Sequence, residues 1–246
     1  MGEAGVSRGA AFYARQGGPL GDLLTLLHPP YTAWNMSYVA LGAVLAPDMG
    51  AGRLLLTLVA FFGGTGIASH ALDELNGRPL KTGLSDRSLK GMAALGLALA
   101  LVATLAGAVV ISPWILLFAA VGVLLVFAYT LEWGNGLIHT DLGFALSWGG
   151  FPVVVGYWAQ AESFALPTFV MAGAATLLSL AQRSLSTPSR FFRRRTTSSA
   201  VVFNSDRGEE RWDDQRLLAS WERPLRLLSW TVIVLTLGLV LFRLGM

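Results

Sequence analysis

Long apolar stretches alternate with short polar segments along the chain, and their lengths fit a lipid bilayer. A transmembrane helix needs about 20 mainly apolar residues. On that measure the predicted spans are 30–46, 53–71, 89–111, 114–131, 142–160, 167–184 and 225–242. The first is short, and the fifth is interrupted by Gly149, Gly150 and Pro152. The pattern predicts an all-α, polytopic transmembrane bundle of about seven spans.

The segments outside these spans carry short patterns of their own. Pro19 to His28 is short and amphipathic, which predicts an interfacial helix after the N-terminal tail. The one long hydrophilic segment is 187–224. Within it, a β-branched run and a return run flank a turn signal at Asp206 to Gly208, so a β-hairpin is expected there. Apolar residues then recur at helical spacing and predict an amphipathic helix before the last span; they are Leu217, Leu218, Trp221 and Leu225.

The predicted organisation has four parts. An N-terminal tail and interfacial helix occupy 1–30, and a transmembrane bundle occupies 30–186. A small ordered cytoplasmic cap follows at 187–224, because a long loop without its own structure is unusual in a compact protein. The last transmembrane helix is 225–246.

Composition supports the membrane class and excludes others. The chain is 54% hydrophobic and 13% charged, whereas about a quarter of a soluble domain is charged. It has no cysteine, so neither a disulfide framework nor a thiolate metal site is possible. The predicted span interiors lack ionisable residues, which argues against a pump or a proton-coupled transporter. Membrane lipids are the expected partners, and no nucleic acid is expected.

Basic residues are unevenly distributed between the two sides of the predicted bundle. With the N-terminus on one side, only Arg53 and Arg243 fall on the other. Because cytoplasmic loops carry an excess of Lys and Arg, the N-terminus is predicted to be cytoplasmic and the C-terminus outside. We expect an integral protein of a prokaryotic cell membrane.

The first stretch with candidate chemistry is SHALDELNGRPLKTGLSDR, Ser69 to Arg87. A helix through Leu75 would place His70, Asp73 and Glu74 on one face. Carboxylates hold Mg²⁺ together with water and substrate phosphates. The candidate metal ligands are therefore Asp73, Glu74, His70 and Asn76, and the candidate phosphate-binding residues are Arg78 and Lys81. On spacing alone, solvated charges at a helix end explain the pattern equally well.

A second polar stretch, Leu178 to Arg195, ends the sixth predicted span. Ser179, Gln182 and Ser186 share a helical face, and Arg183 is adjacent to it. This donor-rich mouth suits an anion, so Gln182, Arg183 and Arg190 are candidate ligands for a diphosphate. Arg193 to Arg195 are more simply explained as anchors at the cytoplasmic surface.

Further candidates come from the ends of other spans. Tyr129 and Thr130 fall in the predicted loop between the fourth and fifth spans, where His139 is a weaker candidate. Trp133 and Trp148 are interfacial belt residues or cavity lining. The first span carries the remaining candidates for cavity lining in its opening turns, namely Trp34, Asn35 and Tyr38.

These features together resemble the UbiA superfamily of intramembrane prenyltransferases, over about Leu27 to Gln182. HPPYTAW resembles the entry to the family's first helix, and SHALDELNGRPLKTG resembles a shortened Asn-Asp-x-x-Asp-x-x-x-Asp motif with its Arg-Pro-Leu turn. AYTLEW resembles the Tyr-Ser turn after the fourth helix, and LGFALSWGGFPVVVG the Gly-rich fifth helix. The resemblance implies a bundle of nine helices around a lateral, lipid-facing cavity. It also implies two Asp-rich motifs that bind Mg²⁺ and an isoprenyl diphosphate.

The chain departs from that family pattern in its acidic residues. Asp73 matches the middle Asp of the first motif, whereas Ser69, His70 and Gly77 stand where other polar or acidic residues are expected. SLAQRSLSTP lacks both aspartates of the second motif, and about two helices are missing. Tyr129 and Thr130 match the Tyr-Ser pair. The resemblance therefore implies one Mg²⁺ ion and a diphosphate whose remaining charge is met by Arg78, Lys81, Arg183 or Arg190.

The resemblance implies a transferase that moves an isoprenyl group from a prenyl diphosphate to an apolar or lipid-like acceptor at the cytoplasmic leaflet. Asp73 and Glu74 are the expected catalytic residues. Two alternatives stay open: a UbiA-type terpene cyclase, and a non-catalytic membrane protein that binds an isoprenoid or a lipid. A homodimer would replace the missing helices.

Overall fold

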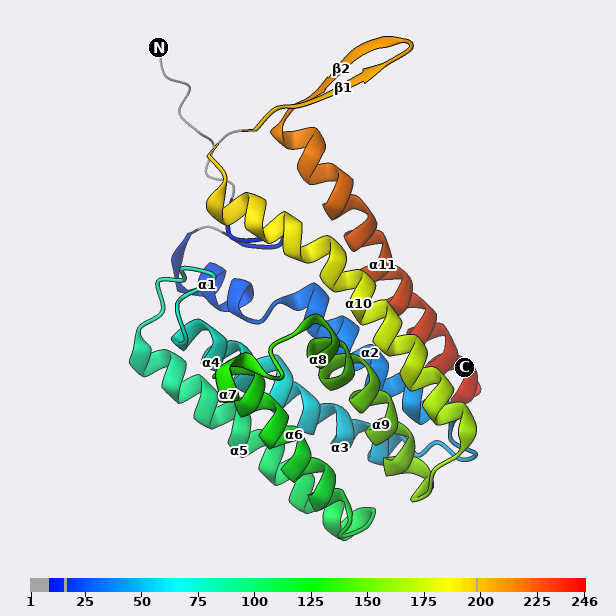
Figure 1. Cartoon of the computed structure of the whole chain (residues 1–246). Coiled ribbons are helices and arrows are strands. Elements are labelled where there is room, and N and C mark those ends of the chain that lie inside the picture. Colours follow the sequence, from blue (N-terminus) through cyan, green and yellow to red (C-terminus); the bar gives the residue numbers. More distant parts are fainter. Residues whose placement is uncertain (1–8, 16, 198) are drawn as a thin grey trace.

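The computed structural model describes residues 9–15, 17–197 and 199–246, so the first part of the predicted N-terminal tail, residues 1–8, lies outside it. The described chain is mostly helical (Figure 1). Its elements are α1 (Gly18–Leu26), α2 (Pro29–Leu45), α3 (Ala51–Phe61), η1 (Phe62–Ala68), α4 (Ser69–Leu75), α5 (Asp86–Val110), α6 (Ile115–Thr130), α7 (Trp133–Gly136), α8 (Asp141–Ala145), η2 (Leu146–Gly150), α9 (Phe151–Ala161), α10 (Leu166–Arg195), β1 (Val201–Ser205), β2 (Gly208–Trp212) and α11 (Asp214–Arg243).

Four helical segments of the described chain are long and apolar enough to cross a membrane. They are Ala51–Leu75, Asp86–Val110, Asp141–Ala161 and Asp214–Arg243. The predicted class, a helical membrane protein, agrees with this finding, but the count of about seven spans is not confirmed. The helices α2 and α6 have only 17 and 16 residues, and α10 carries several arginines in its second half. Length and composition therefore do not identify these three as spans.

The core forms where α2 packs against α9 and α11. Trp34, Tyr38 and Leu41 of α2 pack with Val153 of α9 and Leu225 of α11, and each of these side chains is almost fully buried. Such close packing of α2 and α9 depends on two glycines. A Cβ atom at Gly42 would lie 2.1 Å from the carbonyl oxygen of Val153, and one at Gly156 would lie 2.0 Å from that of Val39. Small residues of this kind let membrane helices approach backbone to backbone.

Two of the long helical segments contain wide, π-helical turns. One is η1, between α3 and α4, and the other is η2, between α8 and α9. Such π-type turns are rare inside helices and are frequent at functional sites. Both occur where the sequence is rich in glycine, with Gly63, Gly64 and Gly66 in η1 and Gly149 and Gly150 in η2.

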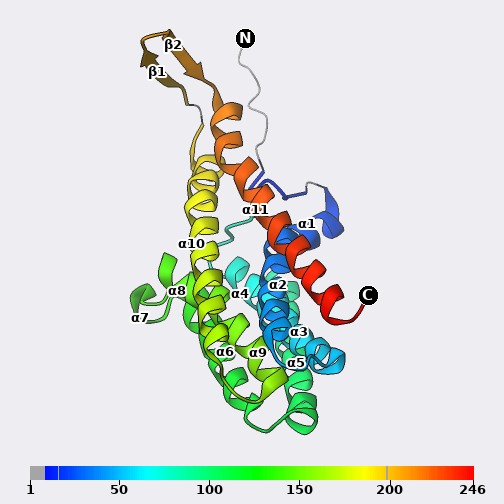
Figure 2. The same cartoon turned by 90° about the vertical axis from the view of Figure 1, so that its right-hand side faces the viewer.

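The predicted hairpin is present and projects beyond the ends of α10 and α11 (Figures 1 and 2). Strands β1 and β2 pair antiparallel, from Val201 opposite Trp212 to Ser205 opposite Gly208. Gly208 has a φ of 110°, a left-handed conformation that favours glycine at the end of this turn.

The rest of the predicted cap is helical rather than looped. Helix α10 continues past Pro188 to Arg195, and α11 already begins at Asp214, whose preceding Asp213 accepts a hydrogen bond from the Arg216 amide at 2.8 Å. The predicted amphipathic helix is therefore the first part of α11 and not a separate element. The buried Glu222 holds the two helices together by accepting hydrogen bonds from Ser189 and Arg193.

Candidate functional site

A cavity of about 480 Å³ lies among the ends of α2, α4, α6 and α10, and we call it the polar chamber. Most of the predicted site residues line it. From the first polar stretch these are His70, Asp73 and Asn76, and from the second Gln182, Arg183 and Arg190. The remaining predicted residues in its lining are Tyr129, Thr130, Trp34, Asn35 and Tyr38. The chamber thus unites side chains that the sequence separates by more than a hundred positions.

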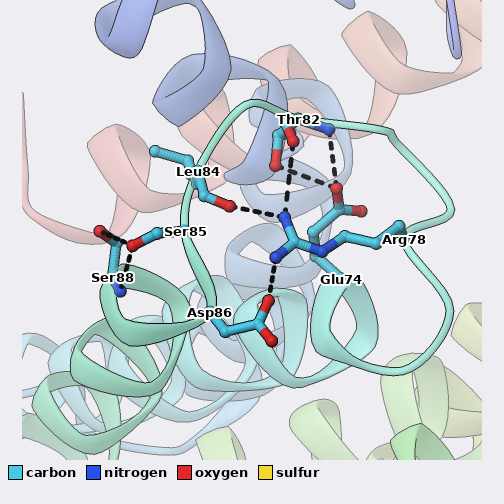
Figure 3. A network of polar contacts seen from close by, with 7 residues as sticks. All are labelled: Glu74, Arg78, Thr82, Leu84, Ser85, Asp86 and Ser88. Carbon is cyan, nitrogen blue, oxygen red and sulfur yellow. Dashed lines mark hydrogen bonds and ion pairs between the residues drawn. The ribbon is translucent and has the colours of Figure 1, made fainter.

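Glu74 does not line the chamber. Its side chain is fully buried, and its carboxylate accepts hydrogen bonds from the Leu80 amide at 2.9 Å and from the amide and hydroxyl of Thr82 at 2.8 and 2.9 Å. Figure 3 shows this carboxylate turned toward Thr82, beneath the loop that joins α4 to α5. Glu74 therefore holds the loop in place, while its neighbour Asp73 faces the chamber.

Arg78 is likewise committed to the loop. Its guanidinium donates a hydrogen bond to the Leu84 carbonyl oxygen at 2.6 Å and forms an ion pair with Asp86 (Figure 3). Lys81 is exposed and is absent from the chamber lining. Both residues have positive φ angles of 54°, which are typical of tight loops. The predicted role of these two cations in binding phosphate does not fit their positions.

The chamber's positive charge comes instead from α10. Arg183, Arg190, Arg194 and Arg195 all line it. The first three share a helical face, because they are seven and four residues apart. Arg193 to Arg195 were predicted to be surface anchors, but Arg194 and Arg195 line the chamber and Arg193 pairs with Glu222. The four-residue spacing of Ser186, Arg190 and Arg194 would have indicated that Arg194 lies on the chamber side of α10. It was missed because the sequence pattern ended the helix before Pro188.

The arginines of the chamber differ in how many hydrogen bonds and contacts their guanidinium groups already make. Arg183 donates to Asp141 at 2.8 Å and lies 5.1 Å above the ring of Phe144. Arg194 donates to the carbonyl oxygen of Ala10 at 3.2 Å. Within the described residues, the guanidinium of Arg190 makes one long hydrogen bond, to Thr187 Oγ1 at 3.4 Å. Arg195 also lines the chamber, but it is exposed to solvent. Among the half-buried chamber arginines, Arg190 is therefore the one best able to contact a ligand.

An aromatic cluster that the sequence did not indicate closes one side of the chamber. Tyr13, His28 and Tyr31 line it beside His70. The rings of His28 and His70 meet edge to face with centroids 4.2 Å apart, and Tyr13 packs on His28 at 5.3 Å. Burial, followed by the neighbouring His70 and arginines, holds the pKa of His28 well below its usual range, so the ring is neutral near neutral pH. Burial also raises the pKa of Tyr13, which keeps its phenol protonated.

The predicted magnesium site was a carboxylate pair, Asp73 with Glu74, assisted by His70 and Asn76. The described residues include no group of three or more His, Asp or Glu side chains that could hold a metal ion. Glu74 is occupied by the loop, and the Asn76 amide nitrogen donates to the carbonyl oxygen of Thr130 at 2.9 Å. The paired site therefore does not fit this arrangement, and Asp73 alone remains in the chamber as a carboxylate from this motif.

A second cavity of about 610 Å³, which we call the apolar groove, runs between η1, α5, α6 and α9. Its lining is almost entirely hydrophobic and includes Leu97, Phe118 and Phe151. Leu101, Leu116 and Val123 line it as well and are 57%, 42% and 43% exposed. The groove therefore opens sideways, toward the surface that lipid would cover in a membrane.

The polar chamber and the apolar groove meet at Thr65 and Trp148, which line both. Thr65 lies in η1 and Trp148 in η2, and Asn35 of α2 joins them. The Asn35 amide nitrogen donates to the Trp148 carbonyl oxygen at 2.7 Å. The Thr65 hydroxyl shares its proton between the Phe61 carbonyl oxygen at 2.7 Å and Asn35 Oδ1 at 3.0 Å. Thr65 had no signal in the sequence, whereas Trp148 was predicted as a belt or cavity residue.

Comparison of the chain with protein-family models, curated proteins and solved structures gave no match. The fold and the site nevertheless define a class: a helical membrane protein with an arginine-lined polar chamber beside a lateral apolar groove, the two sharing Thr65 and Trp148 in their linings.

Proposed function

We propose that this protein is a UbiA-like membrane prenyltransferase, which moves an isoprenyl group from a prenyl diphosphate to an apolar or lipid-like acceptor. The observation that carries the proposal is the junction at Thr65 and Trp148, where the polar chamber and the apolar groove meet. An amphiphile with an anionic head and a hydrocarbon chain matches both compartments at once. Transfer of the chain from water into the groove is favourable by about 0.8 kcal/mol per methylene.

The charges in the chamber favour an anionic head. Four arginines line it, against the carboxylates of Asp73 and Glu132. Arginine binds phosphate through paired N–H donors, and such bonds strengthen where water is excluded. Tyr129, Gln182 and Ser186 add neutral polar groups to the same lining.

The transfer requires one bond to break and one to form. The bond between C1 of the isoprenyl chain and the diphosphate oxygen breaks, and its electron pair leaves with the diphosphate. A nucleophilic carbon or oxygen of the acceptor uses its own electron pair to bond C1, and the acceptor's proton passes to water. The chamber arginines stabilise the negative charge that develops on the leaving oxygen.

The test is product formation by the purified protein in lipid nanodiscs. Prenyl diphosphates of several chain lengths would be incubated with a membrane lipid extract, with and without added Mg²⁺, and analysed by mass spectrometry. The proposal expects release of diphosphate with a lipid that is heavier by one isoprenyl group. A cyclic hydrocarbon formed without acceptor would instead indicate a terpene cyclase, and an intact diphosphate in every condition would refute catalysis.

A second candidate function is non-catalytic binding of an isoprenoid or an anionic lipid. The specific observation in its favour is that Glu74, half of the expected catalytic pair, is fully engaged by the loop. This function predicts that a prenyl diphosphate or anionic lipid stays bound through purification and is recovered chemically unchanged. Turnover in the nanodisc assay would exclude it.

A further inference from the structure

We propose that the arginine face of α10 binds the phosphate groups of the ligand directly, with Arg190 as the principal contact and with no divalent cation required for binding. This inference rests on the proposed function, because it takes a diphosphate as the head that enters the chamber. It goes further by assigning recognition of the phosphate groups to residues on one helix, α10. The residues of the arginine face are Arg183, Arg190 and Arg194.

The first support is the loss of the predicted metal site. A carboxylate pair is what would hold a cation beside a diphosphate, yet Glu74 is fully buried and accepts hydrogen bonds from Leu80 and Thr82. Releasing it would leave those donors without partners. Mg²⁺ usually takes one or two carboxylates in addition to phosphate oxygens. Asp73 is left without its predicted partner, and the other carboxylate in the lining, Glu132, comes from a separate segment after α6.

The second support is the arrangement of the arginines. Arg190 lies between Arg183 and Arg194 along one face of α10, and all three line the chamber. Arg183 is held by Asp141 and Arg194 by the Ala10 carbonyl oxygen, so these two guanidinium groups are already positioned. Preorganised donors cost little to align when an anion binds. Arg190, with one long hydrogen bond to Thr187, supplies the remaining N–H donors.

The third support is charge balance. Four arginines line the chamber, whereas the carboxylates in its lining are those of Asp73 and Glu132. A diphosphate brings several negative charges into the same space, and the arginines can meet them as bidentate partners. Arginine is also weakly hydrated compared with lysine, so its transfer from water to such a contact costs less.

Calorimetric titration in nanodiscs tests this inference with two probes. Inorganic pyrophosphate represents the head alone, and farnesyl S-thiolodiphosphate, which resists ionisation, represents the whole amphiphile. Each would be titrated in EDTA and again in millimolar Mg²⁺. We expect binding of the thiolodiphosphate in EDTA, with a Kd that changes less than about threefold when Mg²⁺ is added. Loss of a charged hydrogen bond in Arg190→Gln should weaken that binding by about tenfold or more.

Two further variants make the result specific. Arg190→Lys keeps the charge but loses the paired donors, so its binding should fall between wild type and Arg190→Gln. Arg223→Gln removes the same charge from an exposed position on α11 and should bind as the wild type does.

Binding that needs Mg²⁺, is lost in Asp73→Asn and survives in Arg190→Gln would overturn the inference while leaving the proposed function intact. Absence of thiolodiphosphate binding in both conditions would overturn the proposed function as well.

Discussion

Asn35 and Trp148 are joined by a hydrogen bond of 2.7 Å from the side-chain amide of Asn35 to the main-chain carbonyl oxygen of Trp148. The bond fastens α2 to the π-helical turn η2 at the boundary between the polar chamber and the apolar groove. The side-chain oxygen of Asn35, Oδ1, also accepts from the hydroxyl of Thr65 in η1, which shares its proton with the Phe61 carbonyl oxygen. One side chain therefore contacts both wide turns. The junction therefore depends on a polar residue within an apolar bundle.

Replacing Asn35 by Ala should destabilise the protein. The Trp148 carbonyl oxygen would lose its donor, and interhelical hydrogen bonds in membrane proteins contribute about 0.6–2 kcal/mol. We expect a lower midpoint of thermal unfolding in detergent and weaker binding of a prenyl diphosphate analogue. Asn204→Ala, at an exposed position in β1, is the matched control and should leave both unchanged. Equal midpoints for the two variants would contradict the role assigned to Asn35.

Removing the charge of Glu74 should lower stability, whereas removing that of its neighbour Asp73 should affect ligand binding. Glu74→Gln places an amide where the carboxylate accepts three hydrogen bonds, so we expect a loss of about 1–3 kcal/mol in the free energy of unfolding. Asp73→Asn should leave stability unchanged, since within the described chain no hydrogen bond or ion pair engages the Asp73 carboxylate. It should instead alter ligand binding or turnover per folded molecule.

Unfolding in detergent and binding in nanodiscs separate these two effects. Glu74→Gln is expected to lower the yield of folded protein but to retain binding in the fraction that folds. If Glu74→Gln abolished binding while unfolding at the wild-type temperature, Glu74 would be a ligand of the site rather than a support of the loop.

The contrast between Asp73 and Glu74 shows what the sequence could and could not predict. Helical periodicity correctly put His70 and Asp73 at one end of an apolar helix, and the polar residues of three distant stretches do meet there. The same periodicity included Glu74, because spacing does not reveal that the following loop returns its own amides to that carboxylate. Arg78 and Lys81 were misplaced for the same reason, as the fold of the loop turns them away.

Helix ends and wide turns were the other sources of error. Pro188 disfavours helix in the residue before it, so the pattern ended α10 early and missed Arg194 as a chamber residue. The role of Thr65 depends on the π-helical geometry of η1, which places it opposite Asn35. Spacing based on 3.6 residues per turn does not describe such a segment. The hairpin was predicted correctly, since its turn and strand signals are local.

Filling the apolar groove should block the hydrocarbon chain of the ligand but not its head. A Cβ atom at Gly64 has no other atom within 4 Å, and the residue lines the groove, so Gly64→Leu extends into it without a backbone clash. We expect binding of farnesyl S-thiolodiphosphate to weaken by about tenfold or more, because the leucine takes space that the hydrocarbon chain would fill, and overpacking of this kind costs about 1–3 kcal/mol. Binding of inorganic pyrophosphate should be unchanged.

Gly238→Leu is the matched control for the groove. Its Cβ also meets open space, but Gly238 is exposed on α11 and is absent from the groove lining. The control should bind both probes as the wild type does. If Gly64→Leu weakened both probes equally, its effect would be on the fold and the groove would have no role in holding the chain.

Acidification should destabilise the protein through His28. Burial and the neighbouring cations lower its pKa in the folded state, whereas the unfolded chain titrates near 6.5. Between these two pKa values the unfolded state binds more protons, so stability falls as the pH decreases below about 6.5. We expect the unfolding midpoint to drop between pH 7 and pH 5, and to drop less in His28→Gln, whose side chain does not titrate. An identical pH dependence in both proteins would rule out His28 as the source.

Replacing Gly156 by Ala should separate α2 from α9. The new Cβ atom would lie 2.0 Å from the Val39 carbonyl oxygen, far inside contact distance, and that oxygen belongs to a helix backbone that cannot rotate away. Overpacking of this kind costs about 1–3 kcal/mol or more, and it should also disturb Trp34 and Tyr38, which line the chamber from α2.

Gly173→Ala is the control, because its Cβ has no atom within 4 Å and alanine favours helix more than glycine does. Thermal unfolding in detergent should show a marked loss for Gly156→Ala and no loss for Gly173→Ala. Equal stability of the two would mean that α2 and α9 do not pack backbone to backbone.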